Sequence, residues 1–187
     1  MEHELKKLED ELSEVRSRLD RARRRAGAKG GVTDYTLKSL DGRDVRLSEL
    51  FGDKQDLIVV HNMGRKCAYC TLWADGFAGF AAHLSDRAGF VLCSADEPAV
   101  AKEFATSRKW PFRVLSGHGS PFARDMGYQP APDQPMPGAS TFHRAADGSI
   151  ERVSTAPFGP GDSFCAIWPF FDMLKDGPGS WVPKYAY

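Results

Sequence analysis

The sequence predicts an α/β fold, in which helices flank a mixed central β-sheet and an amphipathic helix precedes it. Three observations predict this class. Apolar residues recur at helical spacing near the amino terminus, short apolar runs alternate with helical segments from residue 33 onward, and Gly- or Pro-containing turns separate these segments. With 187 residues, the chain has the length of one ordinary domain with a short appendage.

The composition is that of a globular protein, with 42% hydrophobic and 27% charged residues. The formal net charge is +0, so we expect neither nucleic acid nor a membrane surface as a partner. The chain contains no apolar run of about 18 residues, and its first residues are charged, so we expect no membrane span, no secretory signal and a cytoplasmic location. In that compartment four cysteines are more typical of thiols than of a disulfide framework.

The first segment, residues 1–28, is predicted to be an amphipathic helix distinct from the main domain at residues 29–187. Its apolar residues alternate spacings of three and four: Leu5, Leu8, Leu12, Val15, Leu19, Ala22 and Ala26. These residues form one apolar stripe with heptad spacing, the heptad seam. We expect it to be buried, either against the body of the same chain or against the same helix of a second subunit in a homodimer. Acidic residues crowd the first half and basic residues the second, which suits the helix dipole. We therefore interpret the basic run at residues 21–25 as a solvated face.

The elements of the main domain follow in the order β-β-α-β-α-β-α-β-β-α. The first hairpin turns at Asp41-Gly42, and Ser48 is predicted to cap a short helix that Gly52 ends. The strands are expected at residues 34–37, 45–47, 57–61, 90–93, 112–115, 140–144 and 150–154, and the later helices near residues 67–84, 98–108, 122–126 and 165–174. Residues 129–138 contain four prolines and are expected to form a loop.

The helix that follows the strand at residues 57–61 is predicted to bury one face. The residues that recur there at spacings of three and four are Cys70, Trp73, Phe77, Phe80 and Leu84. Gly76 and Gly79 each weaken a helix by about 1 kcal/mol relative to Ala. We therefore expect another part of the chain to pack closely against them.

Cys67 and Cys70 stand where a buried strand passes through a short polar turn into this helix. A Cys-x-x-Cys at such a junction, inside an α/β pattern, is typical of a thioredoxin-like redox site. The helix N-terminus, with Arg65 and Lys66, is expected to lower the pKa of Cys67 from about 8.5 to about 7. Cys67 is therefore the predicted nucleophile and Cys70, on the buried stripe, the predicted resolving cysteine.

Other interpretations of the pair stay open. It could reduce peroxides, remain as an inert relic, or form half of a zinc site completed by His61, Cys93 or Cys165, although no second close pair of ligands supports zinc. Cys93 is predicted to be a small buried hydrophobe, and Cys165 could be a distant resolving cysteine.

Two further side chains could assist the cysteines. His61 could shuttle a proton, although a hydrogen-bonded core or turn histidine is the ordinary alternative. Asp75 could accept a proton from Cys70, against the alternatives of a solvated or helix-capping carboxylate. The aromatic residues from Phe158 to the carboxyl terminus are interpreted as packing residues, which form or shield the apolar core, rather than as a cage that binds a ligand.

Motifs spread along almost the whole chain carry a family resemblance. They are Phe51-Gly52, Val60-His61, Cys67-x-x-Cys70 with Trp73-Ala74-Asp75, Trp110-Pro111-Phe112, Phe142 with Asp147-Gly148, and Gly161-Asp162. On these residues the chain resembles a bacterial thioredoxin-like family designated a domain of unknown function. That family is related to the peroxiredoxin and alkyl hydroperoxide reductase branch of the thioredoxin superfamily. The resemblance implies a thioredoxin-like fold strongly and a particular activity only weakly.

The sequence departs from the better known relatives at two places. Peroxiredoxins carry a Pro and a Thr or Ser shortly before the attacking cysteine, and residues 62–66 contain none of these. Thioredoxins place a cis-proline just before the strand that faces the cysteines. Here Ala139-Ser140 take that place, with Pro137 slightly early.

We therefore expect a thiol-disulfide oxidoreductase that uses Cys67 and Cys70 without a bound cofactor or metal. Its partners would be a protein or small-molecule disulfide and a reductant. A thiol peroxidase-like antioxidant protein, and a non-catalytic interaction or metal-binding protein that keeps the fold, are the alternatives.

Overall fold

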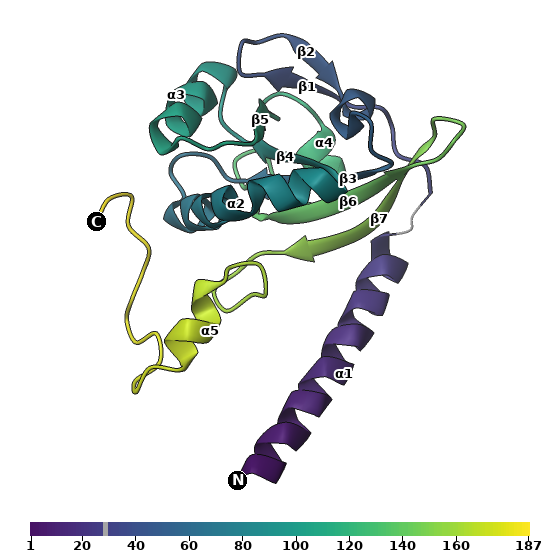
Figure 1. Ribbon diagram of the computed structural model, residues 1–187. Helices are drawn as coiled ribbons and strands as arrows, with labels where there is room; N and C mark the ends of the chain where they lie inside the picture. Colours follow the sequence, from purple (N-terminus) through teal and green to yellow (C-terminus); the bar gives the residue numbers. More distant parts are fainter. Residues whose placement is uncertain (28–29) are drawn as a thin grey trace.

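A computed structural model, which describes residues 1–27 and 30–187, contains one seven-stranded sheet in the order β2-β1-β5-β4-β3-β6-β7 (Figure 1). The elements are α1 (Glu2–Gly27), β1 (Thr36–Ser39), β2 (Asp44–Arg46), the 3-10 helix η1 (Leu47–Phe51), β3 (Asp56–Asn62), α2 (Ala68–Arg87), β4 (Gly89–Ser94), α3 (Pro98–Arg108), β5 (Arg113–Ser116), α4 (Phe122–Asp125), β6 (Gly138–Arg144), β7 (Ile150–Pro157) and α5 (Ile167–Asp172). The predicted class is confirmed, and a strand or helix lies near each predicted residue range. The observed order of the main domain, β-β-α-β-α-β-α-β-α-β-β-α, has one strand and one helix more than the predicted order. The predicted boundary between residues 28 and 29 lies outside the described residues.

The middle of the sheet is parallel, and its two sides are antiparallel. β3 pairs with β4 and β4 with β5 in parallel, whereas β6 pairs antiparallel with β3, and β1 antiparallel with β5. Asn62 and Ser94, the last residues of β3 and β4, are register partners. The loops that follow them therefore meet at one edge of the sheet, the position at which α/β sheets place their functional groups.

Each face of the sheet packs against its own apolar core. Because side chains alternate along a strand, Leu57 and Val59 of β3 point into one core and Val60 into the other. The first core includes Phe51 of η1 and Phe122 of α4, together with Tyr128. The second is formed mainly by α2, the facing residues of the sheet and aromatic residues of the carboxyl-terminal segment, with Ala105 from α3. Met63 and Cys67, which precede α2, pack against this second core.

The short helix η1 begins at Leu47, two residues earlier than predicted, and Ser48 does not cap it. Arg46 occupies the N-cap position, and its N–H donates to the Glu49 carboxylate at 2.9 Å. The N–H and hydroxyl of Ser48 instead donate to Asp34, at 2.7 and 2.8 Å. Gly52, with φ 56, follows the helix as predicted.

The buried face of α2 differs from the predicted one. Its buried residues are Cys70, Thr71, Trp73, Ala74, Phe77 and Ala81, whereas Phe80 is 47% exposed. The contacting stripe therefore continues from Phe77 to Ala81, four residues on, because an α-helix turns once in 3.6 residues. Gly76 and Gly79 are exposed, and a Cβ built at Gly79 would meet no atom within 4 Å. The expected close packing at these glycines is wrong.

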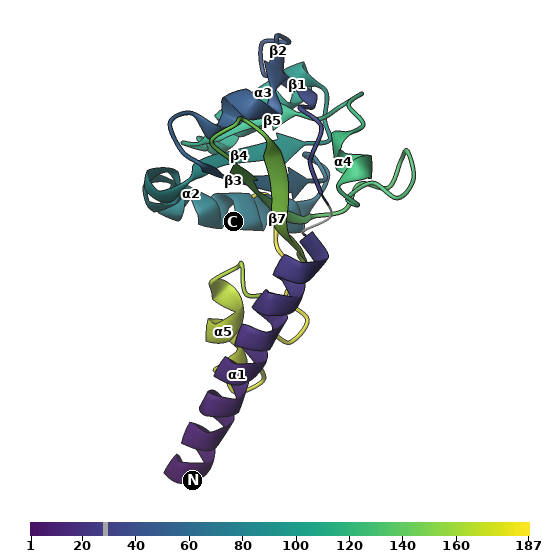
Figure 2. The ribbon, with the colours of Figure 1, turned by 90° about the vertical axis from the view of Figure 1, so that its right-hand side faces the viewer.

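Helix α1 extends away from the sheet, with the amino terminus at its far end in both views (Figures 1 and 2). Its seam does not pack on the body of the chain, because Leu5, Leu12 and Leu19 are 58%, 49% and 46% exposed. Its last turns touch the body, where Arg23 lies over the Phe164 ring. Gly27 is buried against the backbone of Val153 in β7. The interpretation that the body covers the seam is therefore wrong for most of the helix.

Among residues 1–27 and 30–187, no helix combines the length and the apolar character that crossing a membrane requires.

Candidate functional site

Cys67 occupies the N-cap of α2, the position at which a side chain satisfies the free N–H groups of the first turn. Its Sγ accepts a hydrogen bond from the Cys70 N–H at 3.0 Å. The hydroxyl and N–H of Thr71 both donate to the Cys67 carbonyl, at 3.0 and 3.1 Å. Sulfur here takes the place of the Ser or Asp oxygen that usually caps a helix. The helix dipole favours negative charge at this atom.

The two cysteine side chains are coupled to each other. The Cys70 thiol, acting as a hydrogen-bond donor, is the largest influence that lowers the pKa of Cys67, and the pKa falls from 9.0 to about 7. Burial opposes this shift, and the N–H groups of Cys70 and Tyr69 support it. The pKa of Cys70 is raised, first because its proton bonds to the Cys67 sulfur and then by burial. One sulfur is therefore poised to ionise and the other to hold its proton.

The cations that precede Cys67 do not act as expected. The low pKa of Cys67 arises from the Cys70 thiol and from the N–H groups of Cys70 and Tyr69, with no contribution from Arg65 or Lys66. The Arg65 guanidinium instead lies 3.9 Å from the Glu103 carboxylate of α3. It points toward another helix, so the prediction that Arg65 and Lys66 lower this pKa is wrong.

The loop between β3 and α2 is held by two side chains that the sequence analysis did not single out. The Asn62 side-chain oxygen accepts from the Gly64 N–H at 2.8 Å. The Asp96 carboxylate accepts from the Arg65 N–H at 2.7 Å. Gly64 has φ 94, and a Cβ built on it would lie 2.5 Å from the Asp96 carboxylate. A glycine is therefore required here, both for its φ and for the approach of Asp96.

Asp96 is the second residue after β4, and β4 is the parallel neighbour of β3. The carboxyl ends of neighbouring parallel strands lie at the same edge of a sheet. A polar residue just after the strand at residues 90–93 was therefore the sequence signal that could have identified Asp96. The Ser116 hydroxyl donates to the Asp96 carbonyl at 2.6 Å. This contact ties β5 to the same loop cluster.

Cys70 lies deep in the second core, with 3% of its surface exposed. Its neighbours in that cluster include Trp73, Phe77 and Trp168. The Met63 N–H points at its sulfur from 3.5 Å and favours the thiolate form. Cys67 is half-buried. Of the two sulfurs, Cys67 is thus the more accessible one.

The carboxyl-terminal segment reaches the cysteine end of α2. The Arg108 guanidinium donates to the Tyr185 carbonyl at 2.6 Å, and the Tyr185 ring lies edge-on to Phe104 with the ring centroids 6.5 Å apart. The pKa of Tyr185 is raised, first by burial and then by the charges of Cys67 and Cys70. Tyr185 therefore lies within electrostatic reach of the pair.

Asp75 has partners other than Cys70. Its carboxylate accepts two hydrogen bonds from the Arg108 guanidinium and one from the Trp110 indole N–H, the last at 2.9 Å. Since both oxygens are engaged by α3 and the residues after it, the structure does not support Asp75 as the proton acceptor of Cys70. It links α2 to α3 instead.

His61 points away from the cysteine pair. Its ring stacks on Tyr128, with centroids 3.9 Å apart, and its Nε2 is 3.0 Å from the Ser140 hydroxyl. Tyr128 belongs to the first core and Cys70 to the second, on the opposite face of the sheet. Burial lowers the pKa of His61 to about 3. The interpretation of His61 as a hydrogen-bonded core histidine is confirmed.

Cys93 shares the face of His61, its register partner, and both line a cavity of about 560 Å³. Burial raises the pKa of Cys93 to about 12, which confirms the interpretation as a small buried hydrophobe. Cys165 is buried in the same core as Cys70. Within the described parts of the chain, His, Cys, Asp and Glu side chains nowhere gather in threes around a common metal position. The half zinc site completed by these residues is therefore not supported.

Strand β6 begins at Gly138, two residues earlier than predicted, so Pro137 directly precedes it. The Pro137 carbonyl accepts from the Phe158 N–H at 3.0 Å. None of the described peptide bonds is cis. The position before the strand is thus occupied by proline, in the trans form.

Comparison with known proteins identifies relatives at the level of family and fold. The sequence profile described as "Bacterial protein of unknown function (DUF899)" matches residues 1–184. Chloroplastic peroxiredoxin Q of Gentiana triflora is 27% identical over 135 residues, which cover 71% of this chain and 61% of that protein. Chloroplastic peroxiredoxin Q of Oryza sativa subsp. japonica is 27% identical over 128 residues, 68% of this chain and 58% of that protein. The match thus spans about three fifths of these curated relatives.

Among solved structures, peroxidoxin BcpB from Mycobacterium tuberculosis superimposes with a TM-score of 0.56 and 23% identity, covering 70% of this chain and 85% of that one. This likeness shows that the fold is thioredoxin-like, as the sequence predicted.

Proposed function

The chain belongs to the family described as bacterial protein of unknown function (DUF899), and on this premise we propose that it is a thiol-disulfide oxidoreductase with Cys67 as nucleophile and Cys70 as resolving cysteine. One observation carries the proposal. The Cys67 sulfur caps α2 and accepts the Cys70 N–H at 3.0 Å, while the Cys70 thiol lowers its pKa to about 7. At neutral pH about half of Cys67 is then thiolate, the form that attacks disulfides.

In the first step the Cys67 thiolate attacks one sulfur of a substrate disulfide. A bond forms between Cys67 and that sulfur, the substrate S–S bond breaks, and the other substrate sulfur leaves as a thiolate. The charge that held the Cys70 proton is consumed in this step. The largest influence that raises the pKa of Cys70 is therefore removed once the mixed disulfide has formed.

In the second step Cys70 loses its proton to solvent or to the departed thiolate, and its sulfur attacks Cys67. The Cys67–substrate bond breaks, the second substrate thiolate leaves, and a Cys67–Cys70 disulfide remains. The Met63 N–H, 3.5 Å from the Cys70 sulfur, stabilises the attacking thiolate. Two electrons have passed to the substrate, and an external dithiol or two monothiols restore the reduced pair. The cytoplasm, where thiol reductants are abundant, is the proposed location.

The test is reduction of insulin disulfides by dithiothreitol, with the wild type and two serine variants. The wild type is expected to accelerate precipitation of the insulin chains, and Cys67→Ser to leave only the dithiothreitol background. Cys70→Ser is expected to accumulate a mixed disulfide on Cys67, which intact-protein mass spectrometry detects. Cys93→Ala, altered on the opposite face of the sheet, is the matched control and should resemble the wild type. Equal rates for the wild type and Cys67→Ser would refute the proposal.

A thiol peroxidase is the second candidate, because the curated relatives are named peroxiredoxin Q. Here Cys67 would attack the peroxide O–O bond, giving a sulfenic acid and an alcohol or water. The Cys70 thiol would then attack the sulfenic sulfur, form the Cys67–Cys70 disulfide and release the sulfenic oxygen as water. Peroxide consumption by the reduced protein, compared with insulin reduction in the same preparation, separates the two. We expect disulfide reduction to be the faster reaction, because the loop at residues 62–66 lacks the Pro and Thr or Ser of peroxiredoxins.

A further inference from the structure

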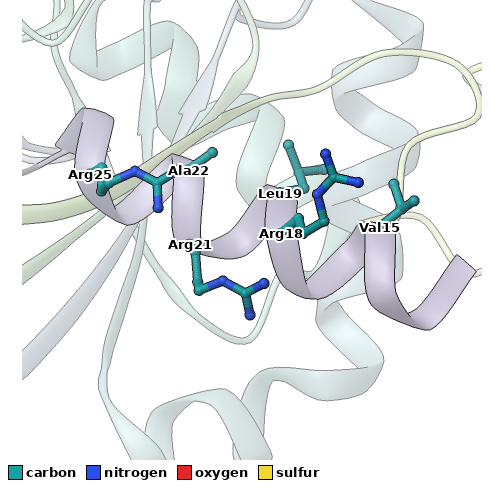
Figure 3. Close-up of a pocket in the computed structure, with 6 residues that line it drawn as sticks. All are labelled: Val15, Arg18, Leu19, Arg21, Ala22 and Arg25. Atoms are coloured by element: carbon teal, nitrogen blue, oxygen red, sulfur yellow. The ribbon is translucent and has the colours of Figure 1, made fainter. Parts of the chain in front are cut away.

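The exposed seam of α1 is an apolar surface that the chain itself leaves open. Leu5, Leu8, Leu12, Val15 and Leu19 are between 46% and 58% exposed. Figure 3 shows the half nearer the body, where the side chains of Val15, Leu19 and Ala22 lie along the helix beside three arginines. Soluble proteins rarely expose a row of leucines of this length without a partner.

We propose that α1 pairs with α1 of a second copy of this chain as an antiparallel, two-stranded coiled coil. The apolar residues occupy the a and d positions of three successive heptads. In the antiparallel register the two residue numbers of each pair sum to 27. The layers are then Leu5 with Ala22, Leu8 with Leu19, and Leu12 with Val15, each formed twice by the twofold axis. Every layer joins an a position to a d position.

The flanking charges favour the same register. In an antiparallel pair, each e position faces an e position of the other helix, and each g position faces a g position. The four distinct pairs are Glu2 with Arg23, Glu9 with Arg16, Glu4 with Arg25, and Glu11 with Arg18. All four join opposite charges, and such flanking charges set the partner and orientation of coiled coils.

The parallel arrangement of the same two helices is disfavoured. There each g position faces the e position five residues later on the other helix, which pairs Glu4 with Glu9, Glu11 with Arg16, and Arg18 with Arg23. Two of these three pairs join like charges. The division of α1 into an acidic first half and a basic second half is therefore an orientation signal as well as a match to the helix dipole.

The structure leaves room for this partner. With 26 residues, α1 is about 39 Å long, and it extends clear of the sheet in both views (Figures 1 and 2). The two bodies would lie at opposite ends of the helix pair. Two of the eight charged residues already have other contacts. Arg23 lies 3.7 Å from the Asp20 carboxylate and over the Phe164 ring at 5.7 Å, and Glu11 lies 3.7 Å from the Lys7 ammonium. The Glu2–Arg23 and Glu11–Arg18 pairs therefore compete with contacts that the helix already makes.

The experiment measures the dimer dissociation constant of the full chain by analytical ultracentrifugation, with circular dichroism as the check on helicity. Arg18→Glu places a carboxylate opposite Glu11 of the other helix, at both symmetry-related pairs. We expect it to weaken the dimer about tenfold, as two exposed pairs turn from attractive to repulsive. Adding Glu11→Arg to the same chain restores opposite charges and should return the constant to the wild-type value.

Arg24→Glu is the matched control. Each arginine has an acidic residue four positions before it, Glu14 for Arg18 and Asp20 for Arg24. Arg24, however, occupies the f position, which points away from the other helix. It should leave the constant unchanged. A parallel dimer gives the opposite sign for Arg18→Glu, because the introduced carboxylate would then face Arg23. A tighter dimer in Arg18→Glu, or a wild type that stays monomeric at about 100 μM, overturns the proposal. Neither result bears on the chemistry of the cysteines.

Discussion

Replacing Cys70 with alanine removes the S–H group that donates to the Cys67 sulfur, and we expect the pKa of Cys67 to rise. A hydrogen bond to a charged group contributes about 1.5–3 kcal/mol, and one pKa unit corresponds to about 1.4 kcal/mol. Because Cys67 is half-buried, solvent weakens the bond, and the lower end of this range applies. The pKa should therefore rise by about one unit from its value of about 7.

The consequence for reactivity changes sign with pH. At pH 7 the thiolate fraction falls from about one half to about one tenth, while each thiolate becomes about threefold more nucleophilic. Alkylation at pH 7 is then expected to slow by about a factor of two. At pH 9, where both proteins are almost fully ionised, alkylation should be about two- to threefold faster in Cys70→Ala.

The assay is the rate of iodoacetamide alkylation at Cys67 between pH 5 and 10, followed by peptide mass spectrometry so that the other cysteines do not contribute. Cys70→Ser is the matched control, because its hydroxyl keeps a donor at the same place and should keep the midpoint near 7. If the alanine and serine variants both titrate near pH 7, the backbone N–H groups alone hold the thiolate, and the reasoning about the thiol donor is wrong.

Three further changes test the packing. Burial lowers the pKa of His61 from 6.5 to about 3, so the unfolded chain binds more protons between these values. As the pH is lowered from about 6.5 toward 3, the free energy of unfolding should therefore fall by up to about 1.4 kcal/mol per pH unit. Urea unfolding at pH 7 and pH 5 should show a smaller loss in His61→Gln than in the exposed control His83→Gln; equal losses would contradict this. Gly79→Ala should stabilise the protein by about 1 kcal/mol in thermal unfolding, because the position is helical and open; a lower melting temperature would count against the described helix surface. Gly138→Ala should cost about 1–3 kcal/mol, because its Cβ would meet the Tyr128 ring and lie 2.6 Å from the Ala156 carbonyl; an unchanged melting temperature would show that β6 is not packed there as described.

Several features could be predicted because they depend on residues close together in the chain. The strand-to-helix junction at the cysteines follows from an apolar run, a polar turn and a helical period within about 20 residues. The heptad seam of α1 and the hairpin at Asp41-Gly42 are equally local. Where a local pattern was followed one turn too far, the prediction failed. Phe80 fits a 3-4-3 spacing from Cys70, yet Ala81 is the residue buried in the second core.

The partners of the site residues could not be predicted, because they come from distant segments. Asp75 meets Arg108 33 residues away, and Asp96 holds the Arg65 N–H from 31 residues away. Both contacts depend on how the elements around the parallel strands β3, β4 and β5 lie side by side. A single sequence does not reveal that arrangement from local periodicity alone.

By itself, the sequence determined the class of fold, the place of Cys67 and Cys70 at a helix start, and a charged heptad helix before the sheet. These are consequences of backbone period and turn chemistry, which act over a few residues. Only the tertiary structure decided that His61 faces away from the cysteines, that the Cys70 thiol rather than Arg65 lowers the pKa of Cys67, and that the α1 seam stays open. Side-chain direction and burial depend on strand register and packing, which are properties of the whole folded chain.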